Sequence, residues 1–429
     1  MPLTEQHIIK YIEKFRSDTL PRLQKWRNYY DGDQDIKHRI ISDSTKPNNK
    51  IVANYASDIT DNYCGYLTGR PVTYSCNEDI AGIMDVLRAN NATTEDKCLL
   101  KDALIYGTAY ELHYINAAGE ECFKTISPES GFPIYSADLD RTLLYFVRYY
   151  SVEDVVANKS TCYVELYSAN SVARYKTNDQ YSELAPIEIR AHYFGEVPVA
   201  VMEMGDDNRA IFDGIISLQD AYNTIISDRT NDYEVFCDAY MVLSGVLADE
   251  ETLKQMKENR ILQLDGDASA SYLTKQVAPA EVDSLLDKLN RHIRRISHSP
   301  DFTDENFFAQ SGVSLAYKLI AFEDTSANIE AHMRTAIKRR LTLISNIAKL
   351  TSDTFAVGDI NITVARNLPV DVLTTAQAVN QLRGLVSNKT LLTQLPFIDD
   401  PEAECEAAKA DTESTLYNFS GGDSNGDNK

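Results

Sequence analysis

The chain has 429 residues, of which 43% are hydrophobic and 25% are charged, and this composition excludes a fully disordered chain, a collagen-like fibre and a long coiled coil. Acidic residues outnumber basic residues by 64 to 42, so the formal net charge is −22. A protein that binds DNA by neutralising phosphates is normally basic. We therefore expect this chain to repel nucleic acid over most of its surface.

The seven cysteines include no CxxC pair, which argues against a zinc site and against a disulfide framework. No window holds the roughly 18 apolar residues that a membrane span needs, and the N-terminus lacks the apolar stretch of a signal peptide. We therefore expect a soluble intracellular protein with reduced thiols, no metal, no cofactor and no membrane contact.

The first half of the chain combines helices with a region rich in strands. Hydrophobic spacing and turn residues predict helices over 5–30 (interrupted at Pro21), 51–68 and 95–106, a polar loop over 31–50, and strands over 107–200. Tyrosine is dense in the strand region, which is typical of a half-buried sheet. Together these patterns predict an α+β, mainly helical protein with about two to four structural regions.

Residues 206–241 contain no proline and carry apolar residues at helical spacing, so they predict one long helix. Its polar face is acidic, and its apolar stripe is narrow. A compact α/β module follows over 242–278, and Pro279 begins a second helix that ends at 298. Because a long helix with a narrow apolar stripe rarely packs inside one small domain, we expect it to pack against copies of itself or across two layers.

The C-terminal part begins with an irregular segment, 299–312, which predicts an exposed loop. A basic helix is expected from 313 to 350, with a break at 322–325 that allows a kink. Short strands are expected over 353–368. Two further helices, an acidic stretch over 399–413 and a polar tail complete the chain.

Motifs that would indicate catalysis are missing from the sequence. It contains no phosphate-binding loop, no dinucleotide-binding glycine motif, no nucleophile elbow and no HExxH zinc motif. The seven histidines are not at metal-ligand spacing. We therefore predict no catalytic residues and no enzymatic activity, and we favour an architectural or assembly role.

Four stretches, taken in order, carry a family resemblance. They are NNKIVANYASDITDNYCGYLTGRPVTY (48–74), ALIYGTAYELHY (103–114), FGEVPVAVMEMGDDNRAIFDGIISLQDAYNTIISDRTND (194–232) and RISHSPDFTDENFFAQSGVSLAYKLIAFED (295–324). In this order they resemble the portal proteins of tailed bacteriophages that infect Gram-positive bacteria. The resemblance covers most of residues 48–350, and the C-terminal part matches only in being helical and acidic.

The resemblance implies a ring of roughly a dozen subunits at one capsid vertex, through which double-stranded DNA enters and leaves the head. It implies a wing (1–205 and 313–365), a stem (206–241 and 279–298), a clip (242–278), a tunnel loop (299–312) and a helical crown (366–429). The implied partners are the terminase large subunit, a head–tail adaptor, the major capsid protein and the scaffolding protein. The implied location is the virion, with assembly in the host cytoplasm.

The resemblance also assigns candidate site residues. The acidic side chains that could line the channel are Asp213, Asp220, Asp228 and Asp232. The tunnel-loop residues that could contact DNA are Phe302, Thr303, Asn306, Phe307 and Gln310, and the clip residues that could bind partners are Glu250, Glu251, Lys254 and Lys257. The second stem helix offers Arg291, Arg294 and Arg295, either for phosphates or for a neighbouring subunit.

Each assignment has an alternative that the sequence leaves open. The acidic face could be merely solvated or paired with the stem arginines, whose position the helix dipole already explains. The tunnel loop could be an ordinary connector with buried phenylalanines, and charged clip residues are usually just solvated. The whole chain could also be another phage head-assembly protein, such as a scaffold or minor capsid component, or an enzyme with an unrecognised carboxylate site.

Overall fold

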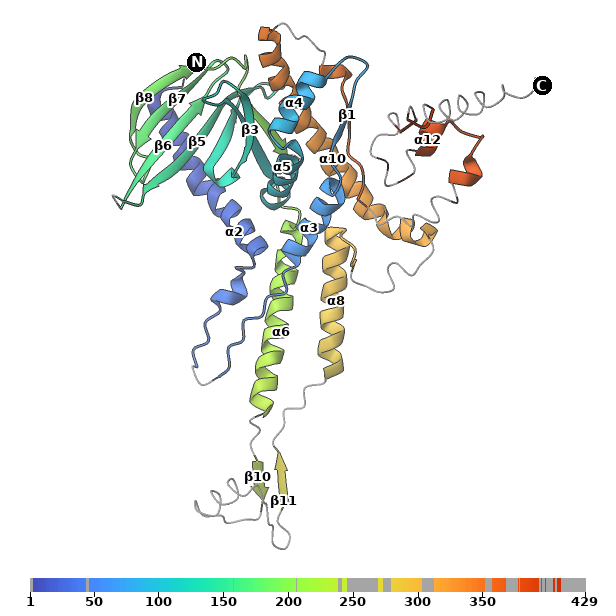
Figure 1. The fold of residues 1–429 in the computed structure, drawn as a ribbon. Coiled ribbons are helices and arrows are strands. Elements are labelled where there is room, and N and C mark those ends of the chain that lie inside the picture. Colours follow the sequence, from blue (N-terminus) through green and yellow to red (C-terminus); the bar gives the residue numbers. More distant parts are fainter. Residues whose placement is uncertain are drawn as a thin grey trace, which may run out of the picture. The chain divides into compact units, whose positions relative to one another are not determined.

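A computed structural model shows the fold (Figure 1). It describes residues 3–43, 46–156, 158–205, 207–237, 241–244, 269–272, 279–302, 312–351, 357–367, 377, 379–392, 395, 398, 404–405 and 407–409. The chain forms two compact units, 1–366 and 367–429. In the second unit, the Ser387 hydroxyl caps the short helix α12 (Asn388–Leu392) by accepting from the backbone N–H of Thr390 at 3.2 Å.

Two N-terminal helices, α1 (Glu5–Lys14) and α2 (Leu20–Asp31), are joined by a π-helical turn. The predicted interruption near Pro21 is confirmed, and Pro21 lies in the first turn of α2, where its missing N–H is not needed. A left-handed glycine, Gly32, ends α2 with a φ of 78°.

The next helices are α3 (Tyr55–Thr68), α4 (Ala81–Ala89) and α5 (Ala92–Tyr106). The prediction that a helix starts at residue 51 was wrong by four positions. The backbone of residues 49–53 bonds to side chains of another helix instead, and the Asn54 side chain caps α3 by accepting from the Ser57 N–H at 3.3 Å.

The predicted strand region is confirmed as two antiparallel sheets. The three-stranded sheet has the order β3-β2-β9 and the five-stranded sheet the order β4-β5-β6-β7-β8. Their strands are β2 (Thr108–Ile115), β3 (Glu121–Ile126), β4 (Gly131–Tyr135), β5 (Leu143–Asp154), β6 (Lys159–Tyr167), β7 (Ser171–Thr177), β8 (Leu184–Ala191) and β9 (Val199–Glu203). Buried Tyr110 and Phe146, whose rings meet at 5.1 Å, join the two sheets in one core.

Gly107 connects α5 to β2 at a point where only glycine fits. Its φ is 74°, and a Cβ atom would lie 2.3 Å from the backbone of Asn208. The same junction explains why the predicted helix over 206–241 was wrong at its start. The Ile211 N–H donates to the Leu104 carbonyl at 2.9 Å, so this part of the chain follows α5, and helix α6 (Ile216–Cys237) begins only after a 3-10 turn.

The remaining elements of the first unit include two long helices, α8 (Pro279–Ser297) and α10 (Gly312–Ala348). Helix α10 is uninterrupted through 322–325, where buried Phe322 packs on the ring of Tyr63 at 4.5 Å. The short strands pair as β1 (Thr73–Ser75) with β12 (Asn361–Thr363) and as β10 (Met241–Ser244) with β11 (Ser269–Tyr272). Mixed helices and sheets confirm the predicted α+β class.

A buried ion cluster fastens α10 to the sheets. The Arg340 guanidinium is 0% exposed and donates to both carboxylate oxygens of Glu111, at 2.8 and 2.6 Å, and to Asp96 at 2.6 Å. Burial by itself raises the pKa of Glu111, but Arg340 and His113 together outweigh burial and lower that pKa to about 2. Arg340 is the cation that both carboxylates share, although burial outweighs it at Asp96, whose pKa is raised.

We predict that Arg340→Met lowers the free energy of unfolding by about 3–5 kcal/mol, because it leaves Glu111 and Asp96 buried without a counter-charge. Urea unfolding followed by the fluorescence of buried Trp26 measures this loss. The control is Arg88→Met, whose side chain is 71% exposed and which should change stability by about 0.5 kcal/mol or less. Equal effects of the two substitutions would contradict the prediction.

Candidate functional site

The two predicted stem helices lie side by side (Figure 1). Arg229 of α6 forms an ion pair with Asp283 of α8. Near the other end of α8, Ile293 is fully buried, and the Tyr63 hydroxyl of α3 donates to the Ser297 carbonyl at 2.9 Å. Helix α6 therefore has a neighbour along its flank, and α8 is fastened to α3 as well.

Helix α6 carries a ladder of polar side chains that binds an extended segment of the backbone. The N–H groups of residues 53, 51 and 49 donate to Asn223 Oδ1 at 2.8 Å, Ser227 Oγ at 2.9 Å and Asn231 Oδ1 at 2.7 Å. Four residues of helix rise about 6 Å, and two residues of strand rise about 6.6 Å. The two periods nearly match, so every second backbone N–H meets a side chain of the next helical turn.

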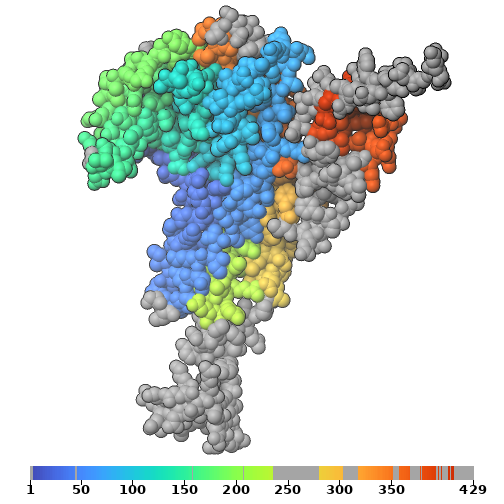
Figure 2. Space-filling view, in the orientation of Figure 1, coloured from blue at the N-terminus to red at the C-terminus, as the bar shows by residue number. Residues whose placement is uncertain are grey.

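This ladder corrects the expectation that the buried face of α6 is an apolar stripe. Gln219, Asn223 and Ser227 are all 0% exposed. Asn223 also donates to the Gln34 side chain at 2.6 Å, so the ladder is part of a buried amide network. Figure 2 shows N-terminal residues, in blue, lying against α6, in yellow-green. The signal of this ladder in the sequence is a polar residue at every fourth position from 219 to 231.

Three predicted channel acids, Asp213, Asp220 and Asp228, are engaged by the N-terminal part of the same chain. Asp213 accepts from the indole N–H of Trp26 at 2.7 Å, and Asp220 accepts from the hydroxyl of Tyr29 at 2.8 Å. Burial raises the pKa of Asp220, so its negative charge is less favoured than that of a solvated carboxylate.

The acids nearer the C-terminal end of α6 are more accessible. Asp228 pairs with Arg39 at 2.6 Å, yet its side chain is 59% exposed. Asp232 is exposed as well. A channel-lining role of all four acids stays a prediction, and Asp228 and Asp232 present the most accessible charge.

The three arginines of α8 have different surroundings. Arg294 pairs with Asp58 of α3 at 2.6 Å and lies over the ring of Tyr55. Arg291 and Arg295 are exposed. Within the described residues Arg291 bonds only to the backbone of its own helix, at 3.3 Å, and Arg295 has no ion pair. Only these two are therefore accessible to a phosphate or a second subunit, and that role stays a prediction.

The predicted tunnel loop is described only at its start. Phe302 is partly buried, and its ring meets the edge of Phe322 at 5.7 Å. The other predicted loop and clip residues lie outside the described residues: Thr303, Asn306, Phe307, Gln310, Glu250, Glu251, Lys254 and Lys257. Their roles remain predictions.

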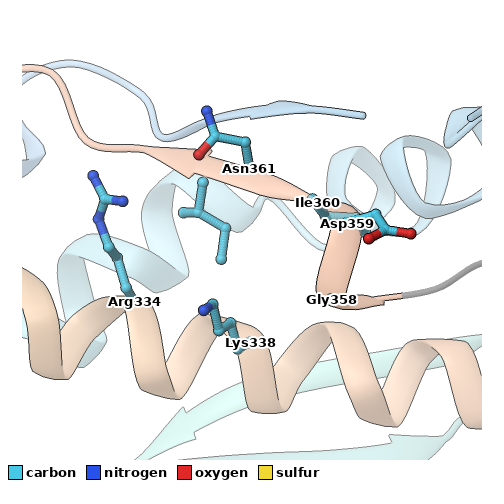
Figure 3. Close-up of a pocket in the computed structure, with 7 residues that line it drawn as sticks. Arg334, Lys338, Gly358, Asp359, Ile360 and Asn361 are labelled. Carbon is cyan, nitrogen blue, oxygen red and sulfur yellow. The ribbon is translucent and has the colours of Figure 1, made fainter. Parts of the chain in front are cut away.

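A small cavity of about 240 Å³ lies between α10 and β12 (Figure 3). Arg334 and Lys338 line the cavity from α10, and Asn361 and Ile362 line it from β12. Arg334 is already paired with Glu330 at 2.5 Å. This polar cavity contains none of the predicted site residues.

In the part of the chain that the structure describes, no three histidine, cysteine or acidic side chains cluster as a metal site would need. None of the described helices combines the length and the apolar character of a membrane-spanning segment.

The fold defines an α+β protein in which two paired long helices are fastened to a unit of helices and sheets. Comparison with known proteins identifies the family. Residues 9–416 match the family described as "Phage portal protein, SPP1 Gp6-like", and the chain belongs to this family.

Two relatives are both named "Portal protein". The "Portal protein" of Clostridium phage phiCD119 is 24% identical over 411 residues, which cover 89% of this chain and 90% of the relative. The "Portal protein" of Bacillus phage SPP1 is 23% identical over 439 residues, which cover 93% of this chain and 84% of the relative. The resemblance to phage portal proteins is thereby confirmed.

We predict that Asn223→Ala lowers the free energy of unfolding by about 2 kcal/mol or more, because the Ala53 N–H and the Gln34 side chain both lose their partner. Hydrogen exchange at residues 49–53 should accelerate as the ladder weakens. Thr224→Ala is the control, because Thr224 is exposed and bonds only to its own helix. If hydrogen exchange at residues 49–53 is as slow in Asn223→Ala as in the control, the ladder does not hold this segment.

Proposed function

We propose that the protein forms a ring at one capsid vertex and that double-stranded DNA passes through the ring during packaging and ejection. The match of residues 9–416 to the portal family carries this proposal. In this proposal the ring has about a dozen subunits related by rotation. It binds the terminase large subunit and later a head–tail adaptor, and it contacts the major capsid and scaffolding proteins during assembly.

The proposed subdivision assigns α6 and α8 to the stem and the two sheets with α10 to the wing. The ion pair between Arg229 and Asp283 supports treating the two helices as one hairpin-like unit. The ladder at Asn223, Ser227 and Asn231 fastens this unit to residues 49–53 of the wing. A stem fastened in this way would transmit force on the DNA to the wing.

The proposed channel works by repulsion. A ring of subunits that each carry a net charge of −22 surrounds DNA with negative charge, so the duplex has no deep electrostatic minimum in which to stick. We assign the largest share of this charge on α6 to Asp228 and Asp232, which are exposed. Exposed Arg291 and Arg295 could either pair with a neighbouring stem or touch phosphates.

Negative-stain electron microscopy of the purified full chain tests the ring. The proposal predicts hollow rings with rotational symmetry, together with a mass near a dozen subunits by native mass spectrometry. A monodisperse monomer at high protein concentration would falsify the proposal.

We predict that Asp232→Lys leaves the rings intact but reduces the DNA that a packaging reaction protects from nuclease, because a ring of lysines would attract phosphates. The matched control is Asp85→Lys on α4, where the native side chain is 75% exposed. Normal packaging by the Asp232 variant would remove this residue from the channel, whereas loss of rings would assign it to assembly instead.

A further inference from the structure

Strand β8 is the outer strand of the five-stranded sheet, and it is open to solvent. It is last in the order β4-β5-β6-β7-β8, so the backbone groups on its outer edge have no strand partner among the described residues. All of its residues except Leu184 and Glu188 are exposed. Figure 1 shows β8 at the margin of the sheet, with no labelled element beyond it.

This edge carries apolar side chains that most soluble proteins avoid at such a position. Ile187 is 49% exposed and Ile189 is 74% exposed. An exposed apolar edge strand is a template for pairing with another segment. Pro186 blocks such pairing at the start of the strand, which leaves residues 187–191 as the pairing stretch.

The face of the sheet beside this edge is basic, in contrast to the chain as a whole. Direct cross-strand neighbours form the row Arg148, Glu165, Arg174 and Glu188. Lys176 and Arg190 belong to the same face, so on the two strands nearest the edge, β7 and β8, three cations (Arg174, Lys176 and Arg190) stand against one carboxylate, Glu188. Glu188 accepts from Arg190 at 2.9 Å and is also near Arg174, whereas Arg190 remains 71% exposed.

A groove of about 310 Å³ adjoins the end of β8. Its lining includes Tyr114 and Ile115 of β2, Val172 and Arg174 of β7, and His192 and Tyr193, which follow β8. Tyr193 is 67% exposed and Tyr114 is 44% exposed. The groove is large enough for an apolar side chain, and it includes Ala191, the last residue of β8.

We propose that β8 and this groove dock an extended acidic segment of a partner protein, which adds to the sheet as a further strand. Main-chain hydrogen bonds to residues 187–191 would supply affinity, as in other cases of strand addition. Because side chains of a strand alternate between faces, the added segment would place carboxylates beside Arg190 and apolar side chains beside Ile189. An apolar residue at its end would fill the groove.

The test is the binding of a fluorescein-labelled peptide to the purified full chain by fluorescence anisotropy. The probe is a nonapeptide in which glutamate alternates with valine, with phenylalanine at one end. We expect saturable binding, with at least a tenfold weaker affinity for the same peptide with lysine in place of glutamate. We also expect Ile189→Glu and Arg190→Glu each to weaken binding of the glutamate peptide at least tenfold.

Two matched substitutions control for exposure and charge. Ile40→Glu replaces an isoleucine that is 91% exposed, and Arg88→Glu replaces an arginine whose side chain is 71% exposed, the same fraction as that of Arg190. Both should leave peptide binding unchanged, and circular dichroism should show native folding for all four variants.

Three outcomes would overturn the inference. The first is no binding of the glutamate peptide, or equal binding of the lysine peptide. The second is a change of oligomeric state in Ile189→Glu without any effect on peptide binding, which would assign the edge to a second copy of this chain. The third is that no peptide binds, whereas the unsubstituted chain binds a labelled DNA duplex and Arg190→Glu abolishes that binding. This outcome would assign the basic face to nucleic acid.

Discussion

The buried guanidinium of Arg340 is the interaction on which the first unit of the chain depends. It is bonded to Glu111 on β2 and to Asp96 on α5, so one side chain of α10 joins a helix and a strand that lie 229 to 244 residues earlier in the sequence. Taking such charges out of water is costly unless all of them find partners. The cluster therefore fixes one relative arrangement of these elements and penalises others.

With α5 and β2 fixed in this way, the chain that leads into α6 is fixed as well. The Ile211 N–H bonds to α5, and Gly107 allows the chain from 204 to 211 to approach the junction of α5 and β2 closely. The ladder on α6 then adds a second attachment, from Asn223 to Asn231. Helix α6 is therefore attached to the rest of the first unit at two levels.

Much of the fold could be predicted from the sequence, because hydrophobic periodicity and turn residues report local structure directly. The strands between 107 and 200, the interruption near Pro21 and the helix that begins at Pro279 follow from such local signals. The helix over 206–241 was predicted too long because its first residues have helical spacing, yet they bond to α5 instead. No local pattern can report a partner that lies about a hundred residues away.

The candidate site was less predictable for a related reason. Asp213 and Asp220 form part of an acidic face in the sequence, but Trp26 and Tyr29 engage them in the structure. A carboxylate that faces solvent and one that accepts from a tyrosine have the same sequence letter. Only Asp228 and Asp232 among the four retain the exposure that the sequence suggested. The polar spacing of Asn223, Ser227 and Asn231 was visible, but it has meaning only once the opposing backbone is known.

The ladder on α6 joins two repeat distances that are close but unequal, namely four residues of helix and two residues of extended backbone. Each rung adds a mismatch of about 0.6 Å between helix and strand. The helix and the segment absorb this mismatch between Asn231 and Asn223, because the three hydrogen bonds stay at 2.7, 2.9 and 2.8 Å. Gln219, one turn before Asn223, is fully buried, and neither of its amide atoms is bonded within the described residues. The segment leaves the ladder there because the Tyr55 N–H donates to the Ala53 carbonyl at 3.0 Å and the backbone coils into α3, so the start of α3 sets the length of this attachment.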